Sequence, residues 1–139
     1  MNNLSRLLPA LCLAAACAFS ASVPAQAQEL KIGFLAPRTG IFTQLGTDMV
    51  NGFQMYLDEH EGKLGGDTVT FIVEDDQGKP DIDVAKAKKL ILQDNVDMLV
   101  GAVLASSAYA LAPVSTAEKM LYIGTVSTAD DLAQLWENP

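Results

Sequence analysis

Apolar and polar positions follow one another along the chain in blocks that predict strands and helices in turn. Mainly apolar runs without regular alternation, at residues 30–37, 68–75, 96–103 and 120–126, are typical of strands buried on both faces. Between these runs, apolar residues recur every three or four positions. This spacing predicts helices over about 44–60, 80–93 and 105–119, and a further helix that begins near residue 127. The alternation of strands and helices with short links predicts an α/β fold whose parallel sheet is covered on both faces.

Glycine and proline refine the ends of these elements. The glycines of "EGKLGGD" are expected to end the first helix, and Pro80 suits the first turn of the second. Asp81 and Asp83 are then placed favourably near the positive end of that helix. Pro113 lies inside the third predicted helix and is expected to kink it or split it.

Hydroxyl pairs stand at the two places where a late strand gives way to a helix. Ser106 and Ser107 follow the third predicted strand, and Ser127 and Thr128 follow the fourth. Ligands of parallel sheets bind outside the carboxyl ends of the strands, and helix amino termini favour negative charge. Each pair is therefore a candidate site for a carboxylate, although Ser and Thr are also preferred helix N-caps, and Thr128 with Asp131 fits a capping box. Two pairs at one edge favour a site.

The order and spacing of several segments resemble those of a known family. The segments are "KIGFLAPRTGIFTQLG", "NGFQMYLDE", "GGDTVTFIVEDDQGKPDIDVAKAKKLI", "VDMLVGAVLASSAYALAP" and "YIGTVSTADDL". Together they resemble the amino-terminal lobe of the periplasmic leucine/isoleucine/valine-binding proteins, the type I solute-binding components of ABC importers. The resemblance extends from residue 30 to about residue 135 and implies a Rossmann-like, parallel-sheet lobe that is incomplete. It also implies that the chain ends near the point where the polypeptide leaves the first lobe.

The resemblance implies a function and a set of contact residues. Two lobes close on a small solute, and the closed form docks on an inner-membrane ABC permease. The loops after the third and fourth strands hold the solute's carboxylate, and the loop after the first strand forms a wall. Carried onto this chain, the ligand-binding residues of these loops are Ala105, Ser106, Ser107, Ser127, Thr128, Phe42 and Leu45.

The residue at position 105 bears on the class of solute. Many amino-acid-binding members have Ser where Ala105 stands, and some relatives take amides, urea or aromatic acids instead. The resemblance therefore implies a solute that carries a carboxylate or an amide: a branched-chain amino acid or its like, an amide or urea, or an aromatic acid. It implies neither a catalytic activity nor a cofactor.

Glu74, Asp75 and Asp76 form a carboxylate cluster at the end of the second predicted strand. Such a cluster can bind a metal through oxygen or serve as an acid/base pair. It is more often structural, with Asp75 and Asp76 accepting hydrogen bonds from turn N–H groups and capping the next helix. An exported α/β enzyme that uses Asp75 and Asp76 is thus one alternative function, and a self-associating or ligand-sensing binding module is another.

The amino-terminal 27 residues have the pattern of a secretory signal peptide. One cation, Arg6, precedes an apolar run that is too short to span a membrane, and Ala25-Gln26-Ala27 fits the cleavage pattern. Residues 28–139 are then the exported lobe, located in the periplasm, without insertion into the membrane after cleavage. Both cysteines lie in the signal segment, and "AAAC" before Cys17 partly fits a lipoprotein site. The net charge of −8 disfavours nucleic acid as a partner.

Overall fold

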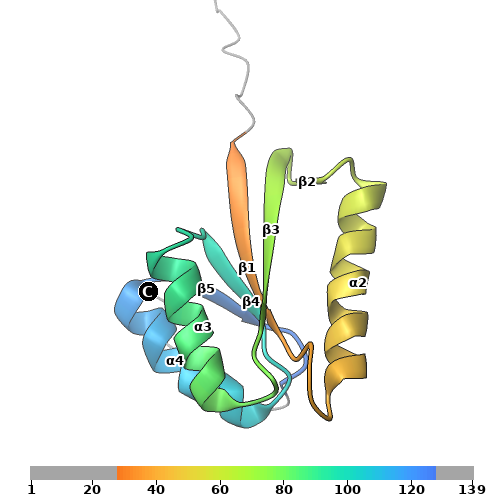
Figure 1. The fold of residues 1–139 in the computed structure, drawn as a ribbon. Coiled ribbons are helices and arrows are strands. Elements are labelled where there is room, and N and C mark those ends of the chain that lie inside the picture. Colours follow the sequence, from red (N-terminus) through yellow and green to blue (C-terminus); the bar gives the residue numbers. More distant parts are fainter. Residues whose placement is uncertain (1–27, 128–139) are drawn as a thin grey trace, which may run out of the picture.

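The computed structural model describes residues 28–127, which form one five-stranded sheet with helices on both faces (Figure 1). The sheet has the order β2-β3-β1-β4-β5. Its strands are β1 (Glu29–Ala36), β2 (Lys63–Leu64), β3 (Asp67–Asp75), β4 (Met98–Gly101) and β5 (Leu121–Gly124). All neighbouring pairs are parallel except β2 with β3. The predicted α/β class with a mainly parallel sheet is confirmed.

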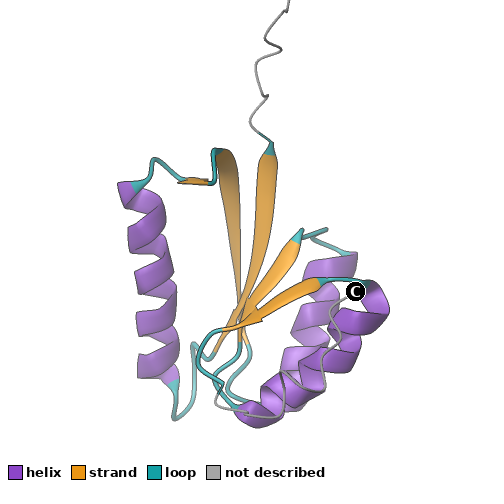
Figure 2. Ribbon diagram, turned by 180° about the vertical axis from the view of Figure 1, so that it is seen from behind, coloured by secondary structure: helices purple, strands orange, loops and turns teal. Residues whose placement is uncertain are grey.

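The helices lie on the faces that right-handed crossovers require. They are α2 (Thr43–Glu59), α3 (Pro80–Leu92) and α4 (Ala105–Glu118). The chain moves from β1 to β3 in one direction and from β3 through β4 to β5 in the other. Because a crossover in the opposite direction must use the opposite face, α2 covers one face while α3 and α4 cover the other (Figures 1 and 2).

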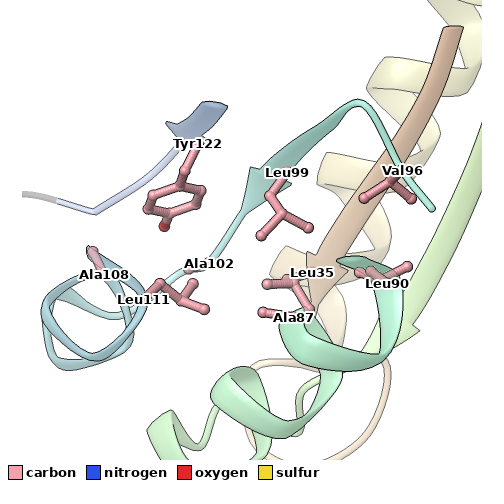
Figure 3. Close-up of a cluster of buried hydrophobic side chains, with 9 residues drawn as sticks. All are labelled: Leu35, Ala87, Leu90, Val96, Leu99, Ala102, Ala108, Leu111 and Tyr122. Atoms are coloured by element: carbon pink, nitrogen blue, oxygen red, sulfur yellow. The ribbon is translucent and has the colours of Figure 1, made fainter. Parts of the chain in front are cut away.

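Each face of the sheet has its own apolar core. On the α2 face, Ile32 and Phe34 of β1 pack with Val50 and Val100. On the other face, a cluster forms between the sheet and the two helices α3 and α4 (Figure 3). Its buried residues are Leu35, Ala87, Leu90, Val96, Leu99, Ala102, Ala108, Leu111 and Tyr122. Successive side chains of β1 thus pack into the cores on opposite faces of the sheet, because side chains alternate between the two faces along a strand.

Two local expectations are corrected. The segment after α2 does not simply end the helix: Lys63 and Leu64 pair antiparallel with β3, because the two glycines at 65 and 66 adopt positive φ and turn the chain back. Helix α4 runs through Pro113 without being split. Pro113 is exposed, so the N–H that proline lacks is lost on the solvent side of the helix.

A search of residues 28–127 for a helix that is long and apolar enough to cross a membrane finds none.

Candidate functional site

The candidate site lies at the carboxyl ends of β1 and β4. From β1 the chain leaves to one side toward β3, and later it reaches β4 on the other side of β1. The connections after β1 and β4 therefore diverge onto opposite faces, and open α/β sheets bind ligands in the crevice expected at such a point, here called the β1–β4 crevice. The loop after β1 and the first turn of α4 border this crevice.

Gly101 lets the two strands meet closely at the base of the crevice. Its φ is +123°, and a Cβ added there would overlap the carbonyl oxygen of Leu35 on the neighbouring strand. The next residue, Ala102, has φ +63° and donates its N–H to the same Leu35 oxygen at 3.0 Å. The backbone therefore turns sharply into α4 directly above β1.

The first turn of α4 contributes the serine pair. The N-cap is Leu104, which forms no side-chain capping bond, so capping by Ser106 or Ser107 is not what the structure shows. The backbone N–H of Ser107 and that of Ala108 both donate to the Leu104 carbonyl, each at 3.1 Å. The N–H groups of Ala105 and Ser106 point out of the helix end, as at any helix amino terminus. Ser106 is exposed, whereas Ser107 is 1% exposed and lies beneath the turn.

The end of β5 lies beside the same corner. β5 pairs in parallel with β4, and the N–H of Thr125 donates to the Gly101 carbonyl at 3.3 Å. The Oγ of Ser127 is buried and has no hydrogen-bond partner among residues 28–127. A buried hydroxyl without a partner in this position fits a site that an incoming polar group completes. Thr128, the other residue expected here, lies outside the described residues.

The wall after β1 consists of a half-buried ring and exposed apolar side chains. Phe42 is the N-cap of α2, and its ring lies against the turn after β3, where a Cβ added at Gly78 would come within 2.8 Å of it. Leu45 is 38% exposed, and Ile41, which the sequence did not single out, is 92% exposed. The wall is therefore a more apolar surface than Phe42 and Leu45 alone suggested.

Asp75 fixes this wall to the sheet. Its Oδ1 accepts hydrogen bonds from the N–H groups of Arg38 (2.8 Å) and Gln77 (2.9 Å), and its Oδ2 accepts one from the Thr39 hydroxyl (2.7 Å). Burial by itself raises the pKa of Asp75, but these hydrogen bonds outweigh it and hold the pKa below its ordinary value. The expectation that Asp75 satisfies turn N–H groups is confirmed. Neither aspartate caps α3, because its N-cap is Lys79.

We expect Asp75→Asn to destabilise the fold by about 1–2 kcal/mol, because bonds to an ionised acceptor are replaced by weaker ones. The ionised form of Asp75 is favoured in the folded state, so its contribution is present above pH 3.8 and is lost as the pH falls below that value. Urea unfolding of both proteins across this range measures the difference. Asp48→Asn, on exposed α2, is the matched control and should change little. A constant difference between wild type and Asp75→Asn at all pH values would contradict this account.

The other two carboxylates of the cluster behave differently. Glu74 forms ion pairs with Lys86 and Lys89, each at 2.6 Å, and hydrogen bonds from these two side chains lower its pKa. Asp76 is 1% exposed and accepts a hydrogen bond from the Gly78 N–H at 2.7 Å through Oδ1. Its Oδ2 has no partner. Burial raises the pKa of Asp76.

A buried acid lies behind the turn that carries Ser106 and Ser107, which we call the serine corner. Asp83 is in the first turn of α3, as predicted, and it is in addition fully buried. Its burial follows from the helix stripe, since residues 83, 87 and 90 share the face of α3 that packs on the core. Burial raises the pKa of Asp83 to about 7, and the nearby Ser107 hydroxyl acts in the opposite direction. The burial of Asp83 could have been predicted from the sequence, because its spacing from Ala87 and Leu90 places it on the same face of the helix.

Tyr122 on β5 lies near the buried polar residues Asp76 and Asp83. Its hydroxyl donates to the Gly101 carbonyl at 3.1 Å, and the residue is 5% exposed. Burial and the two nearby aspartates, Asp76 and Asp83, raise its pKa above the ordinary value. As part of an apolar strand it carried no sequence signal for this role. Within residues 28–127, no three His, Cys, Asp or Glu side chains are grouped so as to hold a metal ion.

Comparison with known proteins agrees with this architecture. The model of the family described as "Periplasmic binding protein" matches residues 29–137. The chain belongs to the periplasmic binding protein family. It is 32% identical over 106 residues to Leu/Ile/Val-binding protein homolog 6 of Brucella abortus, covering 75% of this chain and 27% of that relative. The expected resemblance to the type I members is confirmed.

Two solved structures show the same fold. One is a solute-binding protein of an ABC transporter from Rhodopseudomonas palustris BisB5 in complex with 3,4-dihydroxybenzoic acid. It has a TM-score of 0.75 and 25% identity, over 79% of this chain and 30% of that one. The other, an R. palustris solute-binding protein in complex with benzoate, has a TM-score of 0.70 and 30% identity, over 75% and 29%. The periplasmic binding protein chain described here thus spans about three-tenths of the length of these relatives.

Proposed function

We propose that the protein is the solute-binding component of an ABC importer, and that its lobe holds the carboxylate or amide end of a small solute at the first turn of α4. The observation that carries this proposal is the pair of hydroxyl groups at the carboxyl ends of β4 and β5. Ser106 is exposed at the helix end without acting as its cap, and the Ser127 Oγ is buried without a partner in the part of the chain that the structure describes. A carboxylate at this corner would accept bonds from both hydroxyls and from the helix N–H groups.

The wall after β1 favours an apolar body on the solute. Ile41, Phe42 and Leu45 provide aromatic and aliphatic side chains between the end of β1 and the first turn of α2, and Ile41 and Leu45 are exposed there. Related proteins bear names or ligands of two matching classes, the branched-chain amino acids and the benzoates. Ala105 supplies a backbone N–H but no hydroxyl, so one fewer donor is available for a carboxylate than in members with Ser at that position. We therefore propose an aromatic or branched aliphatic acid, or the corresponding amide.

The setting of this function follows from the same family. We propose that residues 1–27 direct export, that residues 28–139 work in the periplasm, and that an inner-membrane ABC permease is the partner. An enzymatic role for Asp75 is disfavoured, because both of its oxygens are engaged in holding the wall. The importer role is tested on the protein expressed from the whole reading frame, after the DNA has been sequenced past the codon for Pro139 to establish whether a second lobe is encoded.

We expect Ser106→Ala to weaken binding of an anionic solute, because a hydrogen bond to a charged group contributes about 1.5–3 kcal/mol, or roughly tenfold to a hundredfold in affinity. Calorimetric titration with L-leucine, L-isoleucine, benzoate and 4-hydroxybenzoate identifies the probe that binds and measures the loss. Thr116→Ala, an exposed hydroxyl near the other end of α4, is the matched control and should leave affinity unchanged. Equal affinities of wild type and Ser106→Ala for a probe that binds would contradict the placement of the site.

A further inference from the structure

Two buried carboxyl groups lie together beneath the serine corner. Asp76 is 1% exposed and Asp83 is fully buried. Within the described part of the chain, one oxygen of Asp76 and both oxygens of Asp83 have no hydrogen-bond partner. Burial is the largest cause of the raised pKa in both groups; Asp76 raises the pKa of Asp83 further, whereas the interaction with Asp83 acts in the opposite direction on Asp76. Two ionised carboxylates buried together would be costly, because their negative charges repel each other in a place that solvent screens little.

Among residues 28–127, no cationic side chain is among the groups that shift the pKa values of this pair. The groups that act on it are Asp75 at the end of β3, Asp81 on α3, Ser107 on α4 and Tyr122 on β5. The Tyr122 hydroxyl donates to the Gly101 carbonyl, and Ser107 approaches Asp83 without a hydrogen bond of ordinary length. The least costly arrangement is a single proton between the two carboxyl groups, as in other pairs of closely spaced acids.

We propose that Asp76 and Asp83 share one proton beneath the first turn of α4, and that Ser107 links this proton to the solute corner, the part of that turn formed by residues 105–107. This corner then binds an anionic solute only while the pair holds the proton. The solute part of this proposal rests on the proposed function, whereas the shared proton does not. Asp83 and Asp76 are positioning residues, since they act on the corner through Ser107 and do not contact the solute.

The negative charge of the Asp76–Asp83 pair explains why the shared proton would control anion binding. With the proton in place the pair carries one negative charge, and the N–H groups of the α4 turn remain able to attract a carboxylate. Loss of the proton adds a second charge in a buried, weakly screened place directly behind that turn, where it repels the incoming anion. It also gives the buried Ser107 hydroxyl an ionised acceptor on Asp83, which pulls on the turn that carries Ser106. A neutral solute would experience neither change.

The shared proton is tested without any solute. Carbon-detected NMR follows the aspartate carboxyl groups, and amide NMR follows Ser106 and Ser107, as the pH is varied. We expect one carboxyl of the pair to titrate near pH 7, and the two serine amides to shift with the same midpoint. In Asp83→Asn the amide shift near neutral pH should disappear, whereas it should persist in the control Asp81→Asn, whose side chain is exposed.

Two results would overturn the shared proton: both carboxyl groups titrating below pH 5 in the wild type, or an unchanged serine titration in Asp83→Asn. The wild-type measurement decides the matter even where Asp83→Asn does not fold. Stability gives a second readout. Because the folded pKa of Asp83 lies above its unfolded value of 3.8, the wild type should become more stable as the pH falls from about 7 toward 4, and Asp83→Asn should lack this gain.

The link to the solute is tested with benzoate and its neutral analogue benzamide, on the protein from the whole reading frame. We expect benzoate affinity to fall about tenfold for each pH unit above the midpoint of the pair, and benzamide affinity to stay constant. Benzoate affinity that is independent of pH would overturn the link while leaving the proton intact. Binding of neither probe at any pH would remove the link and weigh against the proposed function, whereas the shared proton would still be decided by NMR alone.

Discussion

Gly101→Ala is expected to destabilise the lobe by at least about 3 kcal/mol, the sum of overpacking and an unfavourable backbone conformation. The added Cβ would overlap the carbonyl oxygen of Leu35, which is backbone of the central strand and cannot rotate away. The φ of +123° is in addition a conformation that residues with a side chain rarely adopt. Urea unfolding followed by circular dichroism measures the loss, and a two-state domain of this size has only about 5–15 kcal/mol to lose.

Gly52→Ala is the matched control for this prediction. Gly52 lies in α2, and a Cβ added there meets no atom within 4 Å. Alanine is the better helix former, so this variant should gain about 0.5–1 kcal/mol. A Gly101→Ala protein as stable as Gly52→Ala would show that β1 and β4 do not approach as closely as described. The geometry of the candidate site between these two strands would then be wrong.

Phe34→Ala is expected to destabilise the lobe by about 3–5 kcal/mol, the usual range for removal of a buried aromatic side chain. Phe34 is 2% exposed, and its ring lies 5.7 Å from that of Phe53 on α2 and 5.3 Å from that of Phe71 on β3. Its removal leaves a cavity between helix and sheet and breaks both ring contacts. The free energy of unfolding in urea gives the size of the effect.

Two variants separate cavity formation from general sensitivity of this face. Phe34→Leu keeps much of the buried volume and should lose clearly less than Phe34→Ala. Met55→Ala removes a side chain of α2 that is 60% exposed, and should stay within about 0.5 kcal/mol of wild type. Equal losses in Phe34→Ala and Met55→Ala would mean that α2 does not pack on the sheet through this ring.

The sequence predicted most of the fold because its strands and helices have distinct periods. The apolar runs located β1, β3, β4 and β5, and the helical stripes located α2, α3 and α4 within a few residues. It did not predict β2, because two residues are too few to show any period. It also suggested a split at Pro113, since the cost of a missing N–H depends on whether that side of the helix faces solvent, which only the packing shows.

The site was predicted only in outline. The serine pairs and the loop of Phe42 follow from the rule that ligands bind at the carboxyl ends of parallel strands. The different exposures of Ser106 and Ser107 do not follow from it, because they depend on how α4 is rotated over α3. Asp83 was taken as a charge near a helix end, since an aspartate at that position has a local explanation that hides its place in the buried stripe. The polar contact of Tyr122 was not predicted, because its position in an apolar strand indicates only burial.

The most direct test of the central claim is an amide NMR titration with whichever probe binds, L-leucine, L-isoleucine, benzoate or 4-hydroxybenzoate. The account predicts that the largest shifts fall on residues 105–107 and 125–127, with smaller ones on the wall at residues 41–45. Shifts concentrated elsewhere, for example along residues 60–66 at the opposite end of the sheet, would contradict it, and the solute corner at the first turn of α4 would have to be abandoned.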